Sequence, residues 1–416
     1  MSLGLYLHIP YCFSKCRYCD FYSAPGQRGV PTQYVDALLR ELARFAPEAP
    51  LHPDTIYFGG GTPSLLSPAD AARLIAAAAP APGAEITLEA NPETVTEQTL
   101  CGFREAGVNR ISFGVQSARD SQLKTLGRPH TARQARAAFA AARRAGFTNI
   151  SGDIMLALPH YTQAEFDETL ELIAEGGATH ISAYLLKIEP DSAFGRHPPE
   201  GLPSPDEAAD FYLYAVEHLE HHGYRQYEIS NFAKPGYEGR HNLIYWDCGD
   251  YLGLGPAAHS CMGGRRFYYP ADTEAFLNDK AAPVMDGGCG AEDYLILQLR
   301  LRKGLDLAAY KARYGKEFST AQLAFVKNCV KSGYATFDGS TLCSFSIRVS
   351  TSFVKLTGGG LYAKNQSTQA GFPPRTAHFV LGGFDDTLPL CGQPPGSLAA
   401  GCVSVPADGW KLCRPG

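Results

Sequence analysis

The stretch "HIPYCFSKCRYCDFYS", residues 8–23, places three cysteines, Cys12, Cys16 and Cys19, directly behind a short apolar run at 3–9. Three is an informative number. A structural zinc site takes four ligands, and a disulfide framework needs an even number of cysteines in an oxidising compartment. The C-x3-C-x2-C spacing therefore indicates a group that uses three thiolates and leaves one position open.

Composition places the 416-residue chain among ordinary globular proteins, with 45% hydrophobic and 19% charged residues. The formal charge of −5 gives no basic field for a phosphate backbone, so no nucleic-acid partner is expected. The N-terminus does not read as a signal peptide, and no apolar run is long enough to span a membrane. These features predict a cytoplasmic protein whose twelve cysteines are mostly reduced.

A strand-then-helix pattern repeats along the first half of the chain. The helical stretch at 162–177 carries Phe166, Leu170 and Ile173 at i, i+4 and i+7, which makes one apolar stripe for packing on a sheet. Six such units at a spacing of roughly 30 residues predict parallel strands with helical crossovers, hence an α/β barrel or a doubly wound sheet. The strands are expected at 3–9, 54–60, 85–91, 110–116, 149–158 and 180–188.

The character of the sequence changes twice after about residue 290. The segment up to residue 342 is typical of two or three short helices followed by a hairpin, which suits a small accessory domain. From Cys343 to Gly416 only nine of 74 residues are charged, while glycine and proline together number 18. No helical or strand period persists there, so this tail is predicted to be poorly ordered or a coding-frame artefact.

Soft thiolates on a short loop suit an iron–sulfur cluster, and three of them can hold three irons of a 4Fe-4S cube while the fourth stays open. The spacing closely resembles the signature of radical S-adenosylmethionine (SAM) enzymes, and Tyr18 fits the aromatic residue usual between their last two cysteines. In that superfamily the open iron binds the amino and carboxylate groups of SAM, and an electron from the cluster cleaves its C5′–S bond. A partial zinc site, or three thiols that merely pack, is the less favoured alternative.

The glycine-rich stretch "GGGTPSLL", 59–66, points the same way. Glycines let the backbone approach a ligand where a side chain would collide. In radical SAM proteins this stretch contacts the methionine end of the cofactor. By itself it would be read as a tight strand-to-helix turn.

A wider set of motifs resembles the oxygen-independent coproporphyrinogen III oxidase family over about residues 3–335. They are "LYLHIPYC", "GGGTPSLL", "EANPETV", "NRISFGVQS", "LGRPHTARQA" and "HISAYLLKIEP". The resemblance implies a partial parallel (β/α)6-type radical SAM barrel. It also implies a SAM pocket lined by Tyr6, Tyr18, Gly60, Gly61, Thr62, Glu89, Gln116, Arg128 and Asp153.

The chemistry of these residues suits SAM, with carboxylates for its ribose hydroxyls or amine and Arg128 for its carboxylate. The plainer explanation of each charged residue is a surface ion pair. For Glu89 and Asp153 that explanation is weakened by their places in apolar strands, where an unpaired carboxylate is costly.

Two features separate branches of this family. The oxidases carry a fourth cysteine in C-x3-C-x2-C-x-C, whereas Phe21 stands at that position here, as in the HemW-like branch, whose members are regarded as haem chaperones. That branch also carries an H-N-x-x-Y-W motif implicated in haem binding. The matching "HNLIYW" supplies His241, Asn242, Tyr245 and Trp246.

Imidazole is a common axial haem ligand and aromatic faces pack on porphyrins, so the resemblance implies a haem site with His241 as the ligand. Outside the family such a segment would more often be a corner of the core.

The resemblance divides the chain into a barrel with the "HNLIYW" segment at 1–270, a winged-helix-like and incomplete accessory domain at 271–342, and the tail at 343–416. One local departure lies in "DIMLALPHYT", where Ala157 and His160 stand in place of the usual glycines.

The expected function is that of a 4Fe-4S, SAM-binding haem chaperone that passes haem to an acceptor, such as a respiratory haem protein, and takes electrons from a reductant. The alternative is an enzyme that oxidatively decarboxylates coproporphyrinogen III through a 5′-deoxyadenosyl radical. A zinc-dependent structural module is a third, remote class. The sequence leaves open whether the protein is an enzyme.

Overall fold

The structure is a computed structural model, and it describes residues 2–46 and 51–344. Contacts divide the chain into two compact units, Met1–Val380 and Leu381–Gly416, and every described residue belongs to the first. Apart from residues 343 and 344, the predicted tail lies outside the described residues.

All six predicted strands form, and neighbouring ones run parallel in the order of the sequence. Their bounds are β1 Leu3–Ile9, β2 Thr55–Gly60, β3 Glu85–Ala90, β4 Arg110–Gln116, β5 Asn149–Leu156 and β6 His180–Leu185. The crossover helices are α1 Thr32–Phe45, α2 Pro68–Ala78, α3 Glu97–Glu105, α4 Asp120–Leu126, α5 Ala132–Arg144 and α6 Gln163–Glu175. The predicted parallel (β/α)6-type fold is confirmed.

The sheet is larger than the six strands. It has twelve strands in the order β12-β11-β10-β9-β1-β2-β3-β4-β5-β6-β8-β7, and its two edge strands do not pair with each other in the described part of the chain, so the barrel is partial. The additional strands are β7 Arg225–Glu228, β8 Asn231–Ala233, β9 Asp250–Leu254, β10 His259–Met262, β11 Arg265–Tyr268 and β12 Val284–Gly288. Strand β9 runs parallel to β1, and β12 extends the sheet beyond the predicted domain boundary at residue 270.

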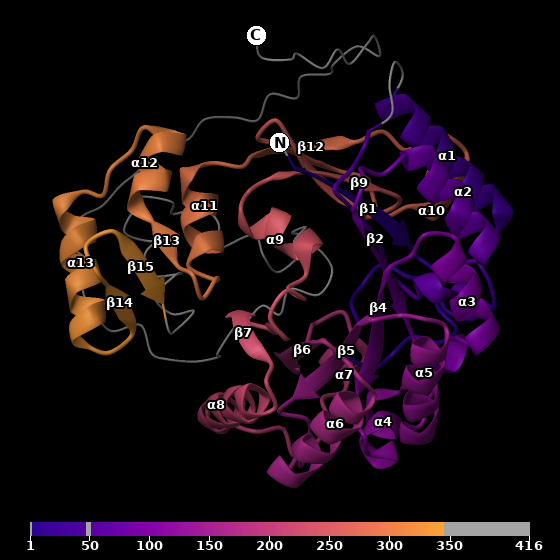
Figure 1. Cartoon of the computed structure of the whole chain (residues 1–416), viewed down its shortest axis with the longest axis horizontal. Coiled ribbons are helices and arrows are strands. Elements are labelled where there is room, and N and C mark those ends of the chain that lie inside the picture. The colour runs from indigo at the N-terminus through magenta and orange to yellow at the C-terminus, as the bar shows by residue number, and fades with distance from the viewer. Residues whose placement is uncertain (1, 47–50, 345–416) are drawn as a thin grey trace. The chain divides into compact units, whose positions relative to one another are not determined.

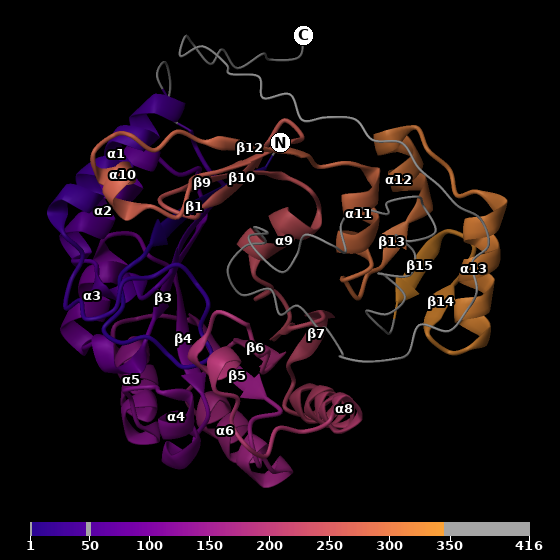
Figure 2. The ribbon, with the colours of Figure 1, turned by 180° about the vertical axis from the view of Figure 1, so that it is seen from behind.

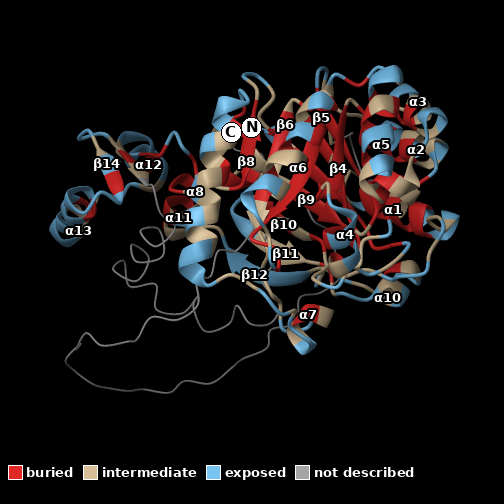
Figure 3. Ribbon diagram, turned by 90° about the horizontal axis from the view of Figure 1, so that it is seen from below, coloured by how far each residue is buried: buried red, intermediate tan, exposed pale blue. Residues whose placement is uncertain are grey.

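Helices α1 to α6 cover the outer side of the curved sheet, and α9 (Arg240–Trp246) lies inside the curve (Figure 1). Strands β1 to β5 are almost entirely buried, whereas β12 at the sheet edge is exposed and the outer helices alternate buried and exposed faces (Figure 3). The predicted stripe on α6 is realised, since Phe166, Leu170 and Ile173 are fully buried. Three further helices connect the later strands: α7 Ala193–Arg196, α8 Pro205–His221 and α10 Thr273–Leu277.

The C-terminal described region is small and mostly helical, as predicted (Figure 2). It consists of α11 Ala291–Gln298, α12 Leu307–Tyr314, α13 Thr320–Lys331 and a three-stranded antiparallel sheet in the order β13-β15-β14. These strands are β13 Leu305–Asp306, β14 Ala335–Phe337 and β15 Thr341–Ser344. The region has an apolar core of its own, around Leu295, Leu305 and Val326.

The loop after β5 carries the departure noted in the sequence. Ala157 and His160 adopt positive φ values of 55° and 53°, in the left-handed region that favours glycine. The substitutions therefore place side chains on a backbone that keeps this glycine-like conformation. Within the described ranges, no helix is both long enough and apolar enough to traverse a lipid bilayer.

Candidate functional site

The cysteine loop leaves β1 and folds back on itself at the carboxyl ends of the parallel strands. Cys12 anchors it, because its N–H donates to the Ala24 carbonyl and its own carbonyl accepts from Gln27 N–H, both at 3.0 Å. Arg17 N–H donates to the Leu126 carbonyl at 2.9 Å, which fastens the loop to the end of α4. Backbone hydrogen bonds thus hold the loop that carries the three thiols.

A chain of hydrogen bonds links two of the thiols through three polar side chains. Thr62 Oγ1 donates to Cys12 Sγ at 3.6 Å and accepts from Asn91 Nδ2 at 3.3 Å. Arg128 donates to Asn91 Oδ1 at 3.1 Å and to Cys16 Sγ at 3.5 Å. Asn91 was not among the predicted site residues, although it belongs to the polar "EANPE" that follows β3.

Arg128 supplies the positive charge beside the cysteine loop. Its burial alone would lower its pKa, but Tyr18 and Cys16 beside it outweigh burial, and the net shift is upward. Arg128 Nη1 also lies 3.5 Å from Tyr18 OH, and Nη2 donates to the Gly114 carbonyl. Its buried Nε has no hydrogen-bond partner in the described part of the chain. The guanidinium therefore keeps one donor for a ligand.

The thiols suit a group that takes one ligand per iron. Burial raises the pKa of the Cys19 thiol to about 12, so a metal must displace its proton. Across residues 2–46 and 51–344, no three His, Cys, Asp or Glu side chains converge on a single ion. A 4Fe-4S cube does not require such convergence, because each thiolate binds a different iron. The donor set and the adjacent cation fit the predicted cluster.

Glycines at the end of β2 permit the approach of the cysteine loop. A Cβ on Gly61 would lie 2.7 Å from the Tyr11 carbonyl oxygen, and one on Gly60, which has a φ of 109°, would lie 2.5 Å from the His8 ring. Gly61 N–H donates to the Ile9 carbonyl at 2.8 Å. Close packing against the loop thus requires these glycines, in addition to any contact with a cofactor.

The other predicted SAM residues are buried around the inner side of the strands. Tyr57 OH donates to Glu89 Oε1 at 2.8 Å, and the rings of Tyr6 and Tyr57 stack at 6.2 Å. Gln116 accepts from Tyr184 OH at 2.8 Å and adopts a φ of 70° at the end of β4. A non-glycine residue held in this conformation is typical of functional sites.

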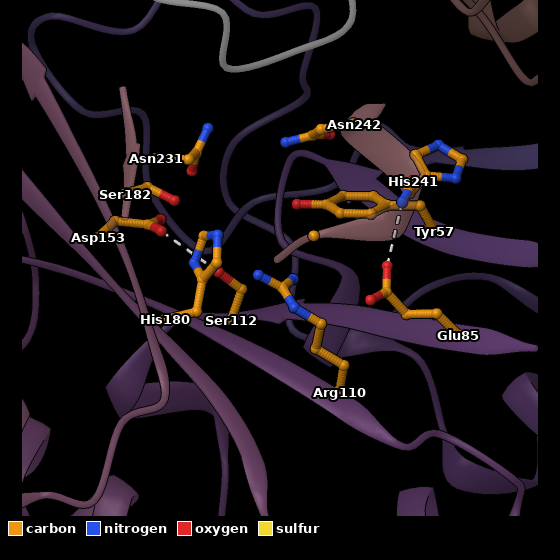
Figure 4. A pocket seen from close by; sticks show the side chains of 11 residues that line it. Tyr57, Glu85, Arg110, Ser112, Asp153, His180, Ser182, Asn231, His241 and Asn242 are labelled. Atoms are coloured by element: carbon orange, nitrogen blue, oxygen red, sulfur yellow. Dashed lines mark hydrogen bonds between the residues drawn. The ribbon is translucent and has the colours of Figure 1, made fainter. Parts of the chain in front are cut away.

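Asp153 stands apart from that group. It accepts a hydrogen bond from Ser112 Oγ at 3.2 Å and lines a pocket on the inner side of the sheet (Figure 4). The pocket is lined by Tyr57, Glu85, Arg110, Ser112, Asp153, His180, Ser182, Asn231, Gly239, His241 and Asn242. It therefore contains one residue predicted for SAM and two predicted for haem.

The imidazole of His241 is buried within this inner region, with 1% of its surface exposed. Its Nδ1 lies 2.7 Å from Thr55 Oγ1 and its Nε2 lies 2.6 Å from Tyr245 OH, while Tyr57 stacks on the ring at 5.1 Å. Burial lowers the pKa of His241 to about 3, and Arg110 contributes in the same direction. The ring is therefore neutral near neutral pH.

The two aromatic residues of the motif are also packed. Tyr245 and Trp246 are 5% and 1% exposed, and the Arg300 guanidinium lies 4.5 Å from the centre of a Trp246 ring. Only Asn242 is partly exposed, facing the pocket (Figure 4). The structure brings the four residues together on α9. Haem ligation by His241 stays a prediction, and it would require α9 to rearrange.

Two family descriptions match the chain, the radical SAM superfamily over residues 6–173 and the HemN C-terminal domain over residues 291–343. Curated relatives named "Heme chaperone HemW" are 44% identical in Escherichia coli, over 62% of this chain and 69% of the relative, and 38% identical in Synechocystis, over 65% and 68%. The Bacillus subtilis relative of the same name is 33% identical over 81% of this chain and 96% of its own length. The chain belongs to the HemW family.

Among solved structures, the HemW-family chain resembles coproporphyrinogen III oxidase (HemN) from Escherichia coli, a radical SAM enzyme, with a TM-score of 0.73. The alignment covers 85% of this chain and 90% of the oxidase at 24% identity, so the likeness concerns the fold alone. The resemblance seen in the sequence is confirmed at the level of the HemW family and the radical SAM fold.

Proposed function

We propose that this HemW-family protein is a radical SAM-type 4Fe-4S protein that acts as a haem chaperone, binding haem and transferring it to an acceptor protein. The observation that carries the proposal is the family membership, since relatives aligned over up to 96% of their length are named as heme chaperones. The intact "HNLIYW" and the phenylalanine at position 21 support it from the sequence.

Cys12, Cys16 and Cys19 would each hold one iron of the cluster. When bound, the cluster supplies single electrons for reductive cleavage of SAM. Arg128 would hold the SAM carboxylate with its unpartnered Nε, and Glu89, Gln116 and the glycines after β2 would orient the rest of the cofactor. A reductant is needed to transfer an electron to the cluster. We also propose a cytoplasmic location for the protein.

His241 is the proposed haem ligand, because its imidazole is the only strong iron donor in the motif. Its low pKa favours ligation, since a neutral ring need not lose a proton to bind iron. The bonds to Thr55 and Tyr245 oppose ligation, so haem binding would displace at least one of them. We propose that α9 shifts as haem binds, exposing one nitrogen of His241 and the ring of Tyr245.

The second candidate function is oxidative decarboxylation of coproporphyrinogen III. The HemN-like fold favours it, whereas the missing fourth cysteine, replaced by Phe21, opposes it.

The test is a haem-transfer assay. The protein is loaded with haem, passed through a desalting column and mixed with membranes that contain the host's haem-free cytochromes. A chaperone should leave the column with its haem still bound. It should then release the haem to the membranes at a rate that rises with membrane concentration. The same membranes mixed with haem-loaded serum albumin give the rate of passive release. If the protein releases haem at a rate independent of the acceptor, transfer is only dissociation and the chaperone proposal fails.

A further inference from the structure

The pocket in front of α9 contains a buried cation that forms no ion pair in the described part of the chain. Arg110, the first residue of β4, is 4% exposed, and its Nε has no hydrogen-bond partner in the described part of the chain. Arg110 forms no ion pair with any described residue, although the carboxylates of Glu85 and Asp153 line the same pocket. Buried charges are normally paired, so an unpaired arginine indicates a missing partner.

The neighbouring charged groups are already engaged. The carboxylate of Glu85 accepts the backbone N–H groups of Arg240 and His241 at 3.3 and 3.1 Å, and Asp153 accepts from Ser112. Glu85 thus holds the first turn of α9 in place. Both carboxylates thus accept hydrogen bonds from their own neighbours, whereas the Arg110 Nε has no acceptor in the described part of the chain.

His180, which lines the same pocket, is uncharged. His180 Nδ1 lies 2.8 Å from Ser151 Oγ and Nε2 lies 2.9 Å from Tyr227 OH, so both nitrogens are occupied. Burial lowers the pKa of His180 well below its usual range, and Arg110 adds to the shift. The positive charge that faces the pocket therefore belongs to Arg110.

The pocket has room for a ligand group and an opening to solvent. Its cavity volume is about 20 Å³, which is room for a small polar group such as one carboxylate, and Tyr57, Ser182 and Asn242 on its wall are partly exposed. Figure 4 shows the Arg110 guanidinium directed into the space between His180 and Tyr57, with the amide of Asn242 on the opposite wall. A planar guanidinium matches a carboxylate through two parallel hydrogen bonds.

We propose that Arg110 and this pocket bind a carboxylate, and that the carboxylate is a propionate of the haem; this inference rests on the proposed function. His241 and Asn242 line the same pocket, so a propionate on Arg110 would hold the porphyrin beside the proposed iron ligand. The carboxylate of SAM is a poor candidate. Arg110 and Gln116 stand at opposite ends of β4, about 20 Å apart at the rise of a strand. Arg128, the residue proposed to hold the SAM carboxylate, donates to the Gly114 carbonyl near the Gln116 end, although Asp153 of the predicted SAM residues lines this pocket.

The test uses protoporphyrin IX without iron, which cannot bind through His241, and its dimethyl ester, which has no carboxylates. Both porphyrins are titrated by fluorescence in the same detergent against the wild type, Arg110→Gln and Arg110→Lys. Arg119→Gln is the control variant, because Arg119 is exposed and ion-paired with Glu168. The wild type and the Arg119 variant should bind the free acid at least tenfold more tightly than the ester. Arg110→Gln should remove that difference, and Arg110→Lys should keep part of it. Circular dichroism verifies folding, and Arg110→Lys keeps the charge if Arg110→Gln does not fold.

Equal binding of acid and ester by the wild type would overturn the Arg110 assignment while leaving the haem chaperone standing. Discrimination that survives in a folded Arg110→Gln variant would overturn it as well. If the wild type binds neither porphyrin nor haem, the proposed function fails together with this inference.

Discussion

His241 Nε2 and Tyr245 OH, four residues apart on α9, lie 2.6 Å from each other. Thr55 Oγ1 is hydrogen-bonded to Nδ1, so both nitrogens of the proposed haem ligand already have a hydrogen-bond partner. Tyr245 therefore holds the imidazole in its buried position and competes with iron for Nε2.

The first prediction follows from that competition. Tyr245→Phe frees Nε2 and should leave haem affinity unchanged or raise it, while costing about 1 kcal/mol of stability for the lost hydrogen bond. His241→Ala removes the axial donor and should weaken haem binding at least about tenfold, near 1.4 kcal/mol, with a shifted Soret band. Spectral titration beside a melting curve measures both effects. A folded His241→Ala variant with unaltered spectrum and affinity would eliminate His241 as the ligand and return the oxidase to near parity.

The cluster cysteines give the second prediction. Alanine at Cys12, Cys16 or Cys19 should abolish the brown 4Fe-4S chromophore, because each thiolate is the sole protein ligand of one iron. The half-buried Cys101 on α3 is the matched control, and its alanine variant should keep full iron content. Iron and sulfide analysis after anaerobic reconstitution provides the measurement. A triple variant of the three loop cysteines that still binds about four irons would refute the assignment.

Arg128 should separate cofactor affinity from cluster assembly. Arg128→Lys keeps the charge near Cys16 but loses Nε, the guanidinium nitrogen that has no partner in the described part of the chain, so SAM affinity should fall by roughly tenfold while the iron content stays intact. Arg119→Lys is the control, since Arg119 pairs with Glu168 at the surface. Equilibrium binding of SAM to both reconstituted variants gives the comparison. An unchanged affinity in Arg128→Lys would exclude Arg128 as the carboxylate partner.

Buried histidines should make the protein sensitive to acid. Burial lowers the pKa of His241 to about 3 and those of His8 and His259 to about 4, whereas an unfolded histidine titrates near 6.5. The unfolded state binds the extra protons, so stability is complete above about pH 6.5 and falls as the pH decreases toward 4. His180, whose pKa burial also lowers well below its usual range, adds a fourth proton, so the steepest slope should approach four protons, about 5 kcal/mol per pH unit.

Denaturant unfolding of the apoprotein between pH 5 and 7.5 measures this slope. His241→Gln should reduce the slope by about one proton, or about 1.4 kcal/mol per pH unit. Substitution of the exposed His221 serves as the control. A stability that does not change between pH 7 and pH 5 would show that these rings are solvated.

Local sequence pattern was sufficient for the parallel core. Each predicted strand had its own apolar run and crossover helix, so β1 to β6 fall within a few residues of their predicted bounds. Strand β9 could not be found this way, because "DYLGL" is short and its longest pairing is with β1, which is remote in sequence. Partners distant in sequence leave little local pattern.

Only the part of the site that depends on local sequence pattern could be predicted. The cysteine spacing is local and identifies a cluster loop without a structure. The roles of Asn91, between Thr62 and Arg128, and of Arg110, unpaired inside the curve, depend on side chains brought together by the fold. In the sequence Arg110 is only the polar start of an apolar run. The burial of Trp246 under Arg300 is equally invisible there.

The central claim is best tested by giving one anaerobically reconstituted, reduced sample with SAM either haem or coproporphyrinogen III. Visible spectra follow haem binding, and chromatography follows coproporphyrinogen III and its decarboxylated products. A haem chaperone should bind haem with a defined stoichiometry and leave coproporphyrinogen III unchanged. Decarboxylation of coproporphyrinogen III, with no haem bound, would contradict the account and identify the protein as an oxidase.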